Sequence, residues 1–191
     1  MTKGRLEAFS DAVIAIIMTI MVLELRVPHG ATLDALRPLL PKFLGYLLSF
    51  VYLGIYWNNH HHLLQAVKHV NGRVLWANMH LLFWLTLIPL TTAWMGENVI
   101  APWPVALYGV VLVLAAIAYF ILTRTLIRAH GKESTLATAV GRDFKGVISV
   151  VFYLAALPLA FVATWGAHLI YALVAVMWLV PDKRIEKRLA G

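Results

Sequence analysis

The sequence contains no cysteine, and only 13% of its 191 residues are charged. The missing cysteines exclude disulfide bonds, thiolate catalysis and thiolate metal sites. A soluble domain is usually about a quarter charged and about half apolar, whereas this chain is 61% hydrophobic and has a mean hydropathy of +0.79. A soluble fold of this length has too little interior to bury so much apolar surface. The composition therefore excludes an ordinary soluble enzyme and a disordered chain, and it predicts that lipid surrounds most of the chain.

Apolar segments long enough to cross a bilayer, which takes about 20 residues, follow one another along the whole chain. We expect spans at residues 6–25, 43–64, 74–95 and 103–126, and two more within the long run 144–180, separated near Thr164. Pro158 and the Trp165-Gly166 pair offer the break in that last run. The sequence thus predicts one all-α integral membrane domain over residues 1–191, with six transmembrane helices.

The basic residues give an independent indication of topology. If the loops alternate between the two sides of the membrane, one side holds 13 of the 16 Lys and Arg residues: Lys3, Arg5, Lys68, Arg73, Arg124, Arg128, Lys132, Arg142, Lys145, Lys183, Arg184, Lys187 and Arg188. The other side holds Arg26, Arg37 and Lys42. The positive-inside rule then places both termini in the cytoplasm, so the net charge of +7 indicates topology and not a nucleic-acid surface. We expect no cleavable signal peptide, because the first apolar run has full spanning length and no small-residue cleavage site follows it.

Polar residues within the first predicted span are candidates for function, because polar groups are costly in hydrocarbon. The segment Arg5-Leu6-Glu7-Ala8-Phe9-Ser10-Asp11 puts a carboxylate, Asp11, inside an apolar run. At about 100° per residue, one stripe of this helix gathers Arg5, Phe9, Ala12, Ile16, Thr19, Ile20 and Leu23. Asp11 points to nearly the opposite side. We therefore expect Asp11 to face neighbouring helices and the stripe to face something else.

The second predicted span carries Trp57-Asn58-Asn59-His60-His61-His62 at the depth where the first span begins, so Asp11 or Ser10 is expected to meet His60. Three interpretations are open: a metal site, a hydrolytic triad of Ser10, Asp11 and His60, and a buried polar contact between the two helices. Consecutive helical residues point about 100° apart, which disfavours both joint chelation of one ion and an adjacent Ser-Asp pair in a triad. We favour the polar contact, because it satisfies groups that lipid cannot satisfy.

The third predicted span carries two further residues of interest. Asn78 is expected to hydrogen-bond across helices. Pro89 is expected to kink the helix, with Thr86 helping to satisfy the freed backbone groups.

These residues resemble the signatures of a known family. The segment from Arg5 to Asp11 fits the R-x-x-x-F-S-D signature that opens the first helix of the endosomal/lysosomal potassium-channel family (transmembrane protein 175 type). The pattern Trp57-x-x-His60-x-x-Leu63-Leu64 resembles the second family motif, in which the last position is often Phe. Asn78 and Pro89 also look like family positions. The length and the six-helix layout resemble the prokaryotic single-repeat members, so the resemblance covers the whole chain.

The resemblance implies a homotetramer in which the first helix of each subunit lines a central pore. Family members lack a TVGYG filter loop, as does this sequence, and rings of branched apolar side chains constrict the pore instead. Carried over by position, Ile16, Ile20 and Leu23 are those rings and Thr19 is a polar layer beside them. A structural polar lock behind the pore helix is expected at Arg5, Phe9, Ser10, Asp11, Trp57, His60 and Asn78.

The expected function is a potassium-permeable cation channel with a hydrophobic gate, and not an enzyme. Rings of Ile or Leu close a pore by dewetting. The expected partners are further copies of the chain, the lipid bilayer and monovalent cations, without nucleic acid, resident cofactor or metal. A proton-conducting protein and a secondary transporter remain alternatives, since the His and Asp positions offer a proton relay and Pro89 and Pro158 interrupt two helical runs. We expect a multi-pass protein of a prokaryotic inner membrane.

Overall fold

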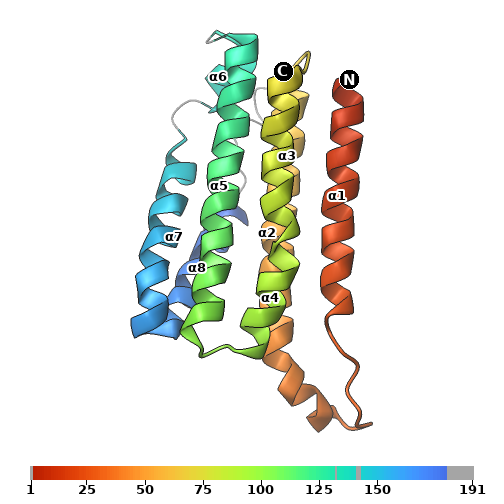
Figure 1. The fold of residues 1–191 in the computed structure, drawn as a ribbon, viewed down its shortest axis with the longest axis vertical. Helices are drawn as coiled ribbons and strands as arrows, with labels where there is room; N and C mark the ends of the chain where they lie inside the picture. The colour runs from red at the N-terminus through yellow and green to blue at the C-terminus, as the bar shows by residue number, and fades with distance from the viewer. Residues whose placement is uncertain (1, 132, 141–142, 180–191) are drawn as a thin grey trace.

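A computed structural model describes residues 2–131, 133–140 and 143–179 of the chain. Within these residues every regular element is a helix (Figure 1). The elements are α1 (Lys3–Leu23), the 3-10 helix η1 (Leu33–Leu39), α2 (Leu40–Gln65), α3 (Gly72–Thr86), α4 (Ile88–Glu97), α5 (Pro102–His130), α6 (Thr135–Val140), α7 (Phe144–Val162) and α8 (Thr164–Leu179). The all-α fold class predicted from the sequence is confirmed.

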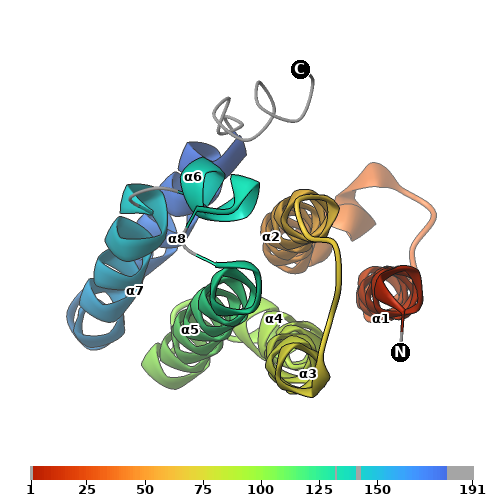
Figure 2. The same ribbon diagram turned by 90° about the horizontal axis from the view of Figure 1, so that it is seen from above.

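The long helices lie side by side in one bundle (Figure 1). Seen along the bundle, α1 lies at one margin, α7 and α8 lie at the other, and α2, α3, α4 and α5 lie between them (Figure 2). Helix α5 packs most extensively, against α7 on one side and α3 on the other, while α1 contacts α2, α3 and α4. The marginal position of α1 leaves one of its sides without a neighbour in the subunit.

Five helical stretches have the length and apolar character of membrane spans. They are Lys3–Leu23, Leu33–Gln65, Gly72–Glu97, Pro102–His130 and Phe144–Val162. Thr164–Leu179 is a shorter apolar helix of 16 residues. The predicted break near Thr164 is confirmed, because α7 ends at Val162 and α8 begins at Thr164. The chain is therefore built from several membrane-competent helices.

The third predicted span is divided into two helices. Helix α3 ends at Thr86 and α4 begins at Ile88, with Pro89 in the first turn of α4. A proline at this place lacks the N–H that would continue the hydrogen bonding of α3. The expectation that Thr86 satisfies a freed backbone group is confirmed, because the Leu87 amide donates to the Trp84 carbonyl and the Thr86 hydroxyl donates to the Phe83 carbonyl at 2.7 Å. On the other side of the break, the Thr91 hydroxyl donates to the carbonyls of Leu87 and Ile88.

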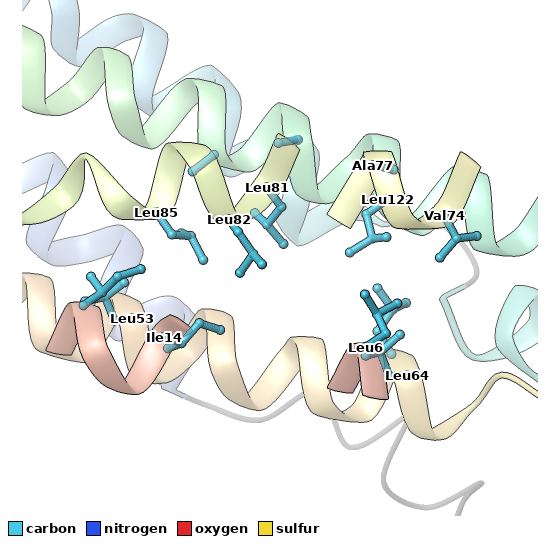
Figure 3. Close-up of a cluster of buried hydrophobic side chains, with 14 of the residues drawn as sticks. Leu6, Ile14, Leu53, Leu64, Val74, Ala77, Leu81, Leu82, Leu85 and Leu122 are labelled. Carbon is cyan, nitrogen blue, oxygen red and sulfur yellow. The ribbon is translucent and has the colours of Figure 1, made fainter. Parts of the chain in front are cut away.

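Two buried apolar clusters hold the bundle together. The first joins α1, α2, α3 and α5, and Figure 3 shows Leu6 and Ile14 of α1 near Leu53 and Leu64 of α2 and the leucines of α3. The second cluster joins α2, α5, α7 and α8. Its largest side chains are the tyrosines Tyr52, Tyr108, Tyr153 and Tyr171. The first cluster fixes the inner face of α1 and therefore also decides which face remains outside.

The basic residues within the described part of the chain are divided between the two ends of the bundle. The start of α1, the loop between α2 and α3 and the end of α5 lie at one end (Figure 1). Of the basic residues assigned to that side, Lys132, Arg142, Lys183, Arg184, Lys187 and Arg188 lie outside the described residues. Arg26, Arg37 and Lys42 lie at the other end, where Lys42 pairs with Glu97 at 2.8 Å.

Candidate pore helix and its polar contacts

The helix that begins the chain has two distinct faces. Its first turn is capped by the Thr2 hydroxyl, which accepts a hydrogen bond from the Arg5 amide at 3.4 Å. The inner face consists of residues spaced three or four apart, as a helix that buries one face requires: Leu6, Ser10, Ile14, Ile17 and Met21. All five are buried against the rest of the bundle.

The outer face of α1 carries the candidate constriction residues. Ile16 is 56% exposed, Ile20 is 44% exposed and Leu23 is 78% exposed. Thr19 is also exposed, and its hydroxyl donates to the Ile16 carbonyl at 2.8 Å. A hydroxyl that donates in this way keeps acceptor lone pairs. The structure therefore brings these four residues onto one uncovered apolar face with a single polar level.

Behind this face, a buried hydrogen-bonded chain joins three helices. Asn78 of α3 donates from Nδ2 to the Ser10 hydroxyl at 2.9 Å, and its Oδ1 lies 2.7 Å from Nε2 of His60 on α2. Ser10 in turn donates to the Leu6 carbonyl at 2.8 Å. All three polar side chains are fully buried. Sequence reasoning named these three residues, and the structure brings them together in one chain of contacts.

Of the two residues expected to meet His60, Ser10 is linked to it through Asn78, whereas Asp11 hydrogen-bonds elsewhere. Its carboxylate accepts a hydrogen bond from Nε1 of Trp57 at 3.0 Å, at a partly exposed site between α1 and α2. In the described part of the chain, no hydrogen bond links Ser10, Asp11 and His60 directly to one another. The arrangement of a hydrolytic triad is therefore missing at this place.

A second contact between α1 and α2 involves residues that sequence reasoning missed. The Glu7 carboxylate lies 3.2 Å from Nδ1 of His61. The His61 ring stacks on Trp57 with centroids 6.1 Å apart, and its Nε2 lies 2.8 Å from the Gln65 amide nitrogen. Their positions in the sequence could have indicated this contact. Glu7 lies one helical turn before Asp11, and His61 follows His60, so both residues flank the predicted contact.

The remaining two members of the predicted polar lock lie outside it. Arg5 and Phe9 are exposed on the outer face of α1. Neither side chain hydrogen-bonds or pairs with the other lock residues within the part of the chain described. Phe9 and Arg5 thus belong to the same uncovered stripe as Ile16 and Ile20, as their helical spacing indicates.

The histidines of α2 point to different partners. His60 contacts Asn78, whereas His61 contacts Glu7. Among the described residues, no group of three or more His, Cys, Asp or Glu side chains has the arrangement of a metal site.

Comparisons with known proteins agree with this architecture. Residues 5–89 match the family described as "Endosomal/lysosomal potassium channel TMEM175". A protein of Chryseobacterium sp. (strain P1-3) named as a potassium channel is 57% identical over 189 residues, which cover 99% of this chain and 98% of that one. A chicken protein named as an endosomal/lysosomal proton channel TMEM175 is 39% identical over 79 residues, which cover 35% of this chain and 16% of that one.

A solved structure is similar over nearly the whole length. It is the crystal structure of a lysosomal potassium-selective channel TMEM175 homolog from Chamaesiphon minutus, with a TM-score of 0.80 and 27% identity, covering 93% of this chain and 96% of that one. The family match at residues 5–89 includes α1, α2 and α3, the helices that carry the exposed stripe and the buried polar chain. From the full-length similarity and the family match, the chain belongs to the TMEM175 family of endosomal/lysosomal potassium channels and their bacterial relatives.

Proposed function

We propose that four copies of this chain form a potassium-permeable cation channel in which α1 of each subunit lines a central pore. The observation that carries the proposal is the uncovered face of α1, with Ile16, Thr19, Ile20 and Leu23 exposed in the subunit. Bacterial relatives named as potassium channels and the similar channel structure support the choice of potassium.

The spacing of the exposed residues defines levels along the proposed pore. With a rise of about 1.5 Å per residue, Ile20 lies about 6 Å beyond Ile16, and Leu23 lies about 4.5 Å beyond Ile20. Four copies around an axis place four apolar side chains at each of these levels. A narrow throat of this kind excludes water and therefore stops an ion, which cannot cross unhydrated. Rotation or tilt of α1 widens the throat and rewets it.

Thr19 is the proposed polar level between the rings of Ile16 and Ile20. Its hydroxyl hydrogen is directed to the Ile16 carbonyl, so the lone pairs of its oxygen are available to a cation. Glu24, exposed at the end of α1, adds negative charge at the outer mouth, and Arg26 opposes it. Because no carbonyl ring replaces the hydration shell, we expect potassium to be preferred over sodium by less than in filter-loop channels.

The buried polar chain is proposed to orient the pore helix. The hydrogen bonds that link Ser10, Asn78 and His60 form only in one rotation of α1, and Asp11 and Glu7 add contacts to α2. Turning α1 away would leave buried polar groups unpaired, which is costly. The lock therefore holds the apolar stripe toward the axis.

The proposed topology has six membrane spans per subunit, with both termini in the cytoplasm of a bacterial cell. It rests on the five span-length helices, on the shorter apolar α8 and on the uneven distribution of Lys and Arg. In this orientation the start of α1 is cytoplasmic and Leu23 lies toward the outer face.

Proton conduction is the second candidate. The contact of Glu7 with His61 and the partly exposed Asp11 place titratable groups beside α1, and relatives in animals are named as proton channels. Such groups pass protons without needing a wide aqueous throat. The two candidates differ in which ion carries the current.

Ion flux into vesicles tests the proposal. The purified chain is reconstituted into vesicles loaded with potassium, and potassium efflux is driven with a protonophore present to balance charge. Replacing potassium by sodium or by the large cation N-methyl-D-glucamine is the matched control. We expect efflux with potassium, less with sodium and none with the large cation. Proton entry when the protonophore is replaced by a potassium ionophore, in a protein that shows no potassium efflux in the first assay, favours the second candidate, and flux that requires a saturating co-substrate favours a transporter.

A further inference from the structure

A cavity of ≈ 320 Å³ lies between α2, α5, α7 and α8, in the part of the bundle that is away from α1 (Figure 2). Its wall is mostly aromatic and branched apolar, with Tyr56 on α2, Tyr119 on α5, Tyr153 on α7 and Trp178 on α8. The volume falls at the lower end of the range of known ligand sites, about 300–1,000 Å³.

Several polar side chains of this wall already hydrogen-bond within the protein. The Tyr119 hydroxyl donates to the Asn59 carbonyl at 3.2 Å, and the Asn59 side chain donates to the Ile55 carbonyl at 2.8 Å. Nε1 of Trp178 donates to the Ser149 hydroxyl at 2.8 Å. A buried water needs two to four polar partners, and apolar cavities stay dry or take up apolar molecules. The wall therefore suits an apolar occupant better than water.

The rim of the cavity lies on the outside of the subunit. Ile117 and Phe120 of α5 and Val147 and Val151 of α7 all line it and are exposed. In a protein that lies in a bilayer, exposed apolar side chains on spanning helices contact lipid acyl chains. Leaving a space of this size empty forfeits dispersion contacts on all sides, so an acyl chain that enters from the bilayer is stabilised there.

The charges at one end of the cavity favour an anionic head group. Arg124 lies over the Phe120 ring at 4.9 Å, and Lys145 lies over the Trp178 ring at 5.9 Å. Both rings line the cavity. Asp143 also lines the cavity, and its carboxylate caps the start of α7 by accepting from the Gly146 amide. The Arg124 guanidinium, at the end assigned to the cytoplasmic leaflet, attracts anionic phospholipid.

We propose that this cavity binds one acyl chain of an anionic phospholipid, with the head group at the end marked by Arg124 and Lys145. The site is separate from the pore helix and is independent of which ion the protein conducts. One premise rests on the proposed function. It is that the rim of the cavity faces lipid, because the channel axis lies on the other side of the subunit, at α1.

Photolabelling from within the lipid tests the site. The full chain is reconstituted into phosphatidylcholine vesicles that contain a small fraction of phosphatidylglycerol with a diazirine in its acyl chain, and labelled residues are mapped after illumination. We expect labels on Tyr56 and Tyr119, which are half-buried in the wall, as well as on exposed positions such as Leu107. Excess unlabelled phosphatidylglycerol is expected to suppress the tyrosine labels more than the Leu107 label.

A cavity-filling substitution provides the second arm. Ala116→Phe places a ring in the cavity, whereas Ala155→Phe adds the same ring on the exposed side of α7, outside the lining. We expect the labels on Tyr56 and Tyr119 to be lost in the first variant and kept in the second. If the labels on these tyrosines persist in a folded Ala116→Phe protein, the acyl chain does not lie in the cavity. If the tyrosines are not labelled in the original chain, no acyl chain enters the cavity. Either result overturns the site.

The head-group preference is tested by changing the probe and the cations. The same diazirine on phosphatidylcholine is expected to label the two tyrosines less than the phosphatidylglycerol probe does. Arg124→Gln is expected to weaken phosphatidylglycerol labelling about fivefold, the equivalent of about 1 kcal/mol per cation. Equal labelling by both lipids overturns the anionic preference. Labelling of a chain that shows no potassium flux supports the lipid site while contradicting the channel, so the two proposals fail separately.

Discussion

At the scale of single residues, the exposed stripe of α1 makes the sharpest prediction at Ile16. Its side chain is 56% exposed, whereas that of Ile17, the next residue, is 3% exposed. We predict that Ile16→Asn hydrates the throat, raises resting potassium flux several-fold and reduces the preference for potassium over sodium, because a polar ring no longer dewets. Vesicle flux and reversal potentials in mixed salts measure both effects.

The matched control for this change is Ile121→Asn. Ile121 is 39% exposed on α5. The same substitution there changes the exposed surface of a helix other than the proposed pore helix α1. We expect its flux to equal that of the original chain. If Ile16→Asn has the same potassium flux and the same ion selectivity as Ile121→Asn, Ile16 does not line the pore.

The contact between Asp11 and Trp57 makes a second residue-scale prediction. In Asp11→Ala, His60 keeps its contact with Asn78. The hydrogen bond that is lost is the one from Nε1 of Trp57. We predict that Asp11→Ala and Trp57→Phe are coupled by about 0.6–1.7 kcal/mol, the size of hydrogen bonds between membrane helices. Thermal or denaturant unfolding of the two single variants and the double variant measures this coupling. Effects that add to within about 0.3 kcal/mol would show that the two side chains do not interact in the folded protein.

At the scale of helices, the close approach of α5 and α8 depends on Gly109. A methyl group at this position would overlap the Tyr171 hydroxyl, which donates to the Val105 carbonyl at 3.1 Å. We predict that Gly109→Ala costs about 1–3 kcal/mol of stability, the usual cost of overpacking. In contrast, Gly54→Ala on α2 meets no atom within 4 Å and is expected to stabilise its helix by about 0.5–1 kcal/mol. Melting temperatures of the two variants test the pair, and a Gly109→Ala protein as stable as Gly54→Ala would contradict this packing.

The helices were largely predictable from the sequence, but their partners were not. Apolar run length places the spans, and a helical wheel separates the exposed Ile16 and Ile20 from Asp11, which contacts α2. A wheel gives the direction of a side chain but not the depth at which two helices meet. For that reason Asp11 or Ser10 was expected to meet His60, whereas Asp11 contacts Trp57 and Ser10 is linked to His60 through Asn78.

Short elements and breaks were the less predictable part of the fold. The third span was expected as one kinked helix, yet α3 and α4 are separate on either side of Leu87. Whether a proline kinks or ends a helix depends on what satisfies the nearby backbone groups, which is decided by packing. Helix α6 has six residues and was not predicted, because it is too short to carry a periodic pattern.

At the scale of the whole molecule, a pore lined by α1 requires an oligomer. A single copy has an apolar stripe on α1 and no surrounding wall, so it offers no path for a hydrated ion. We predict that the purified protein has a mass near four times the 21.3 kDa of the chain. Native mass spectrometry, or light scattering corrected for bound detergent, measures this mass. A stable monomer or dimer that still carries potassium would contradict the central pore.

The absence of cysteine allows the central claim to be tested directly, because any introduced thiol is unique. The measurement is potassium current before and after a membrane-impermeant cationic thiol reagent is added to the outer side. Leu23→Cys, on the exposed stripe, is compared with Met21→Cys, which replaces a 2% exposed side chain of the same helix turn. We predict block of current in Leu23→Cys and no change in Met21→Cys. Current that the reagent leaves unaltered in a labelled Leu23→Cys protein would contradict a pore lined by α1.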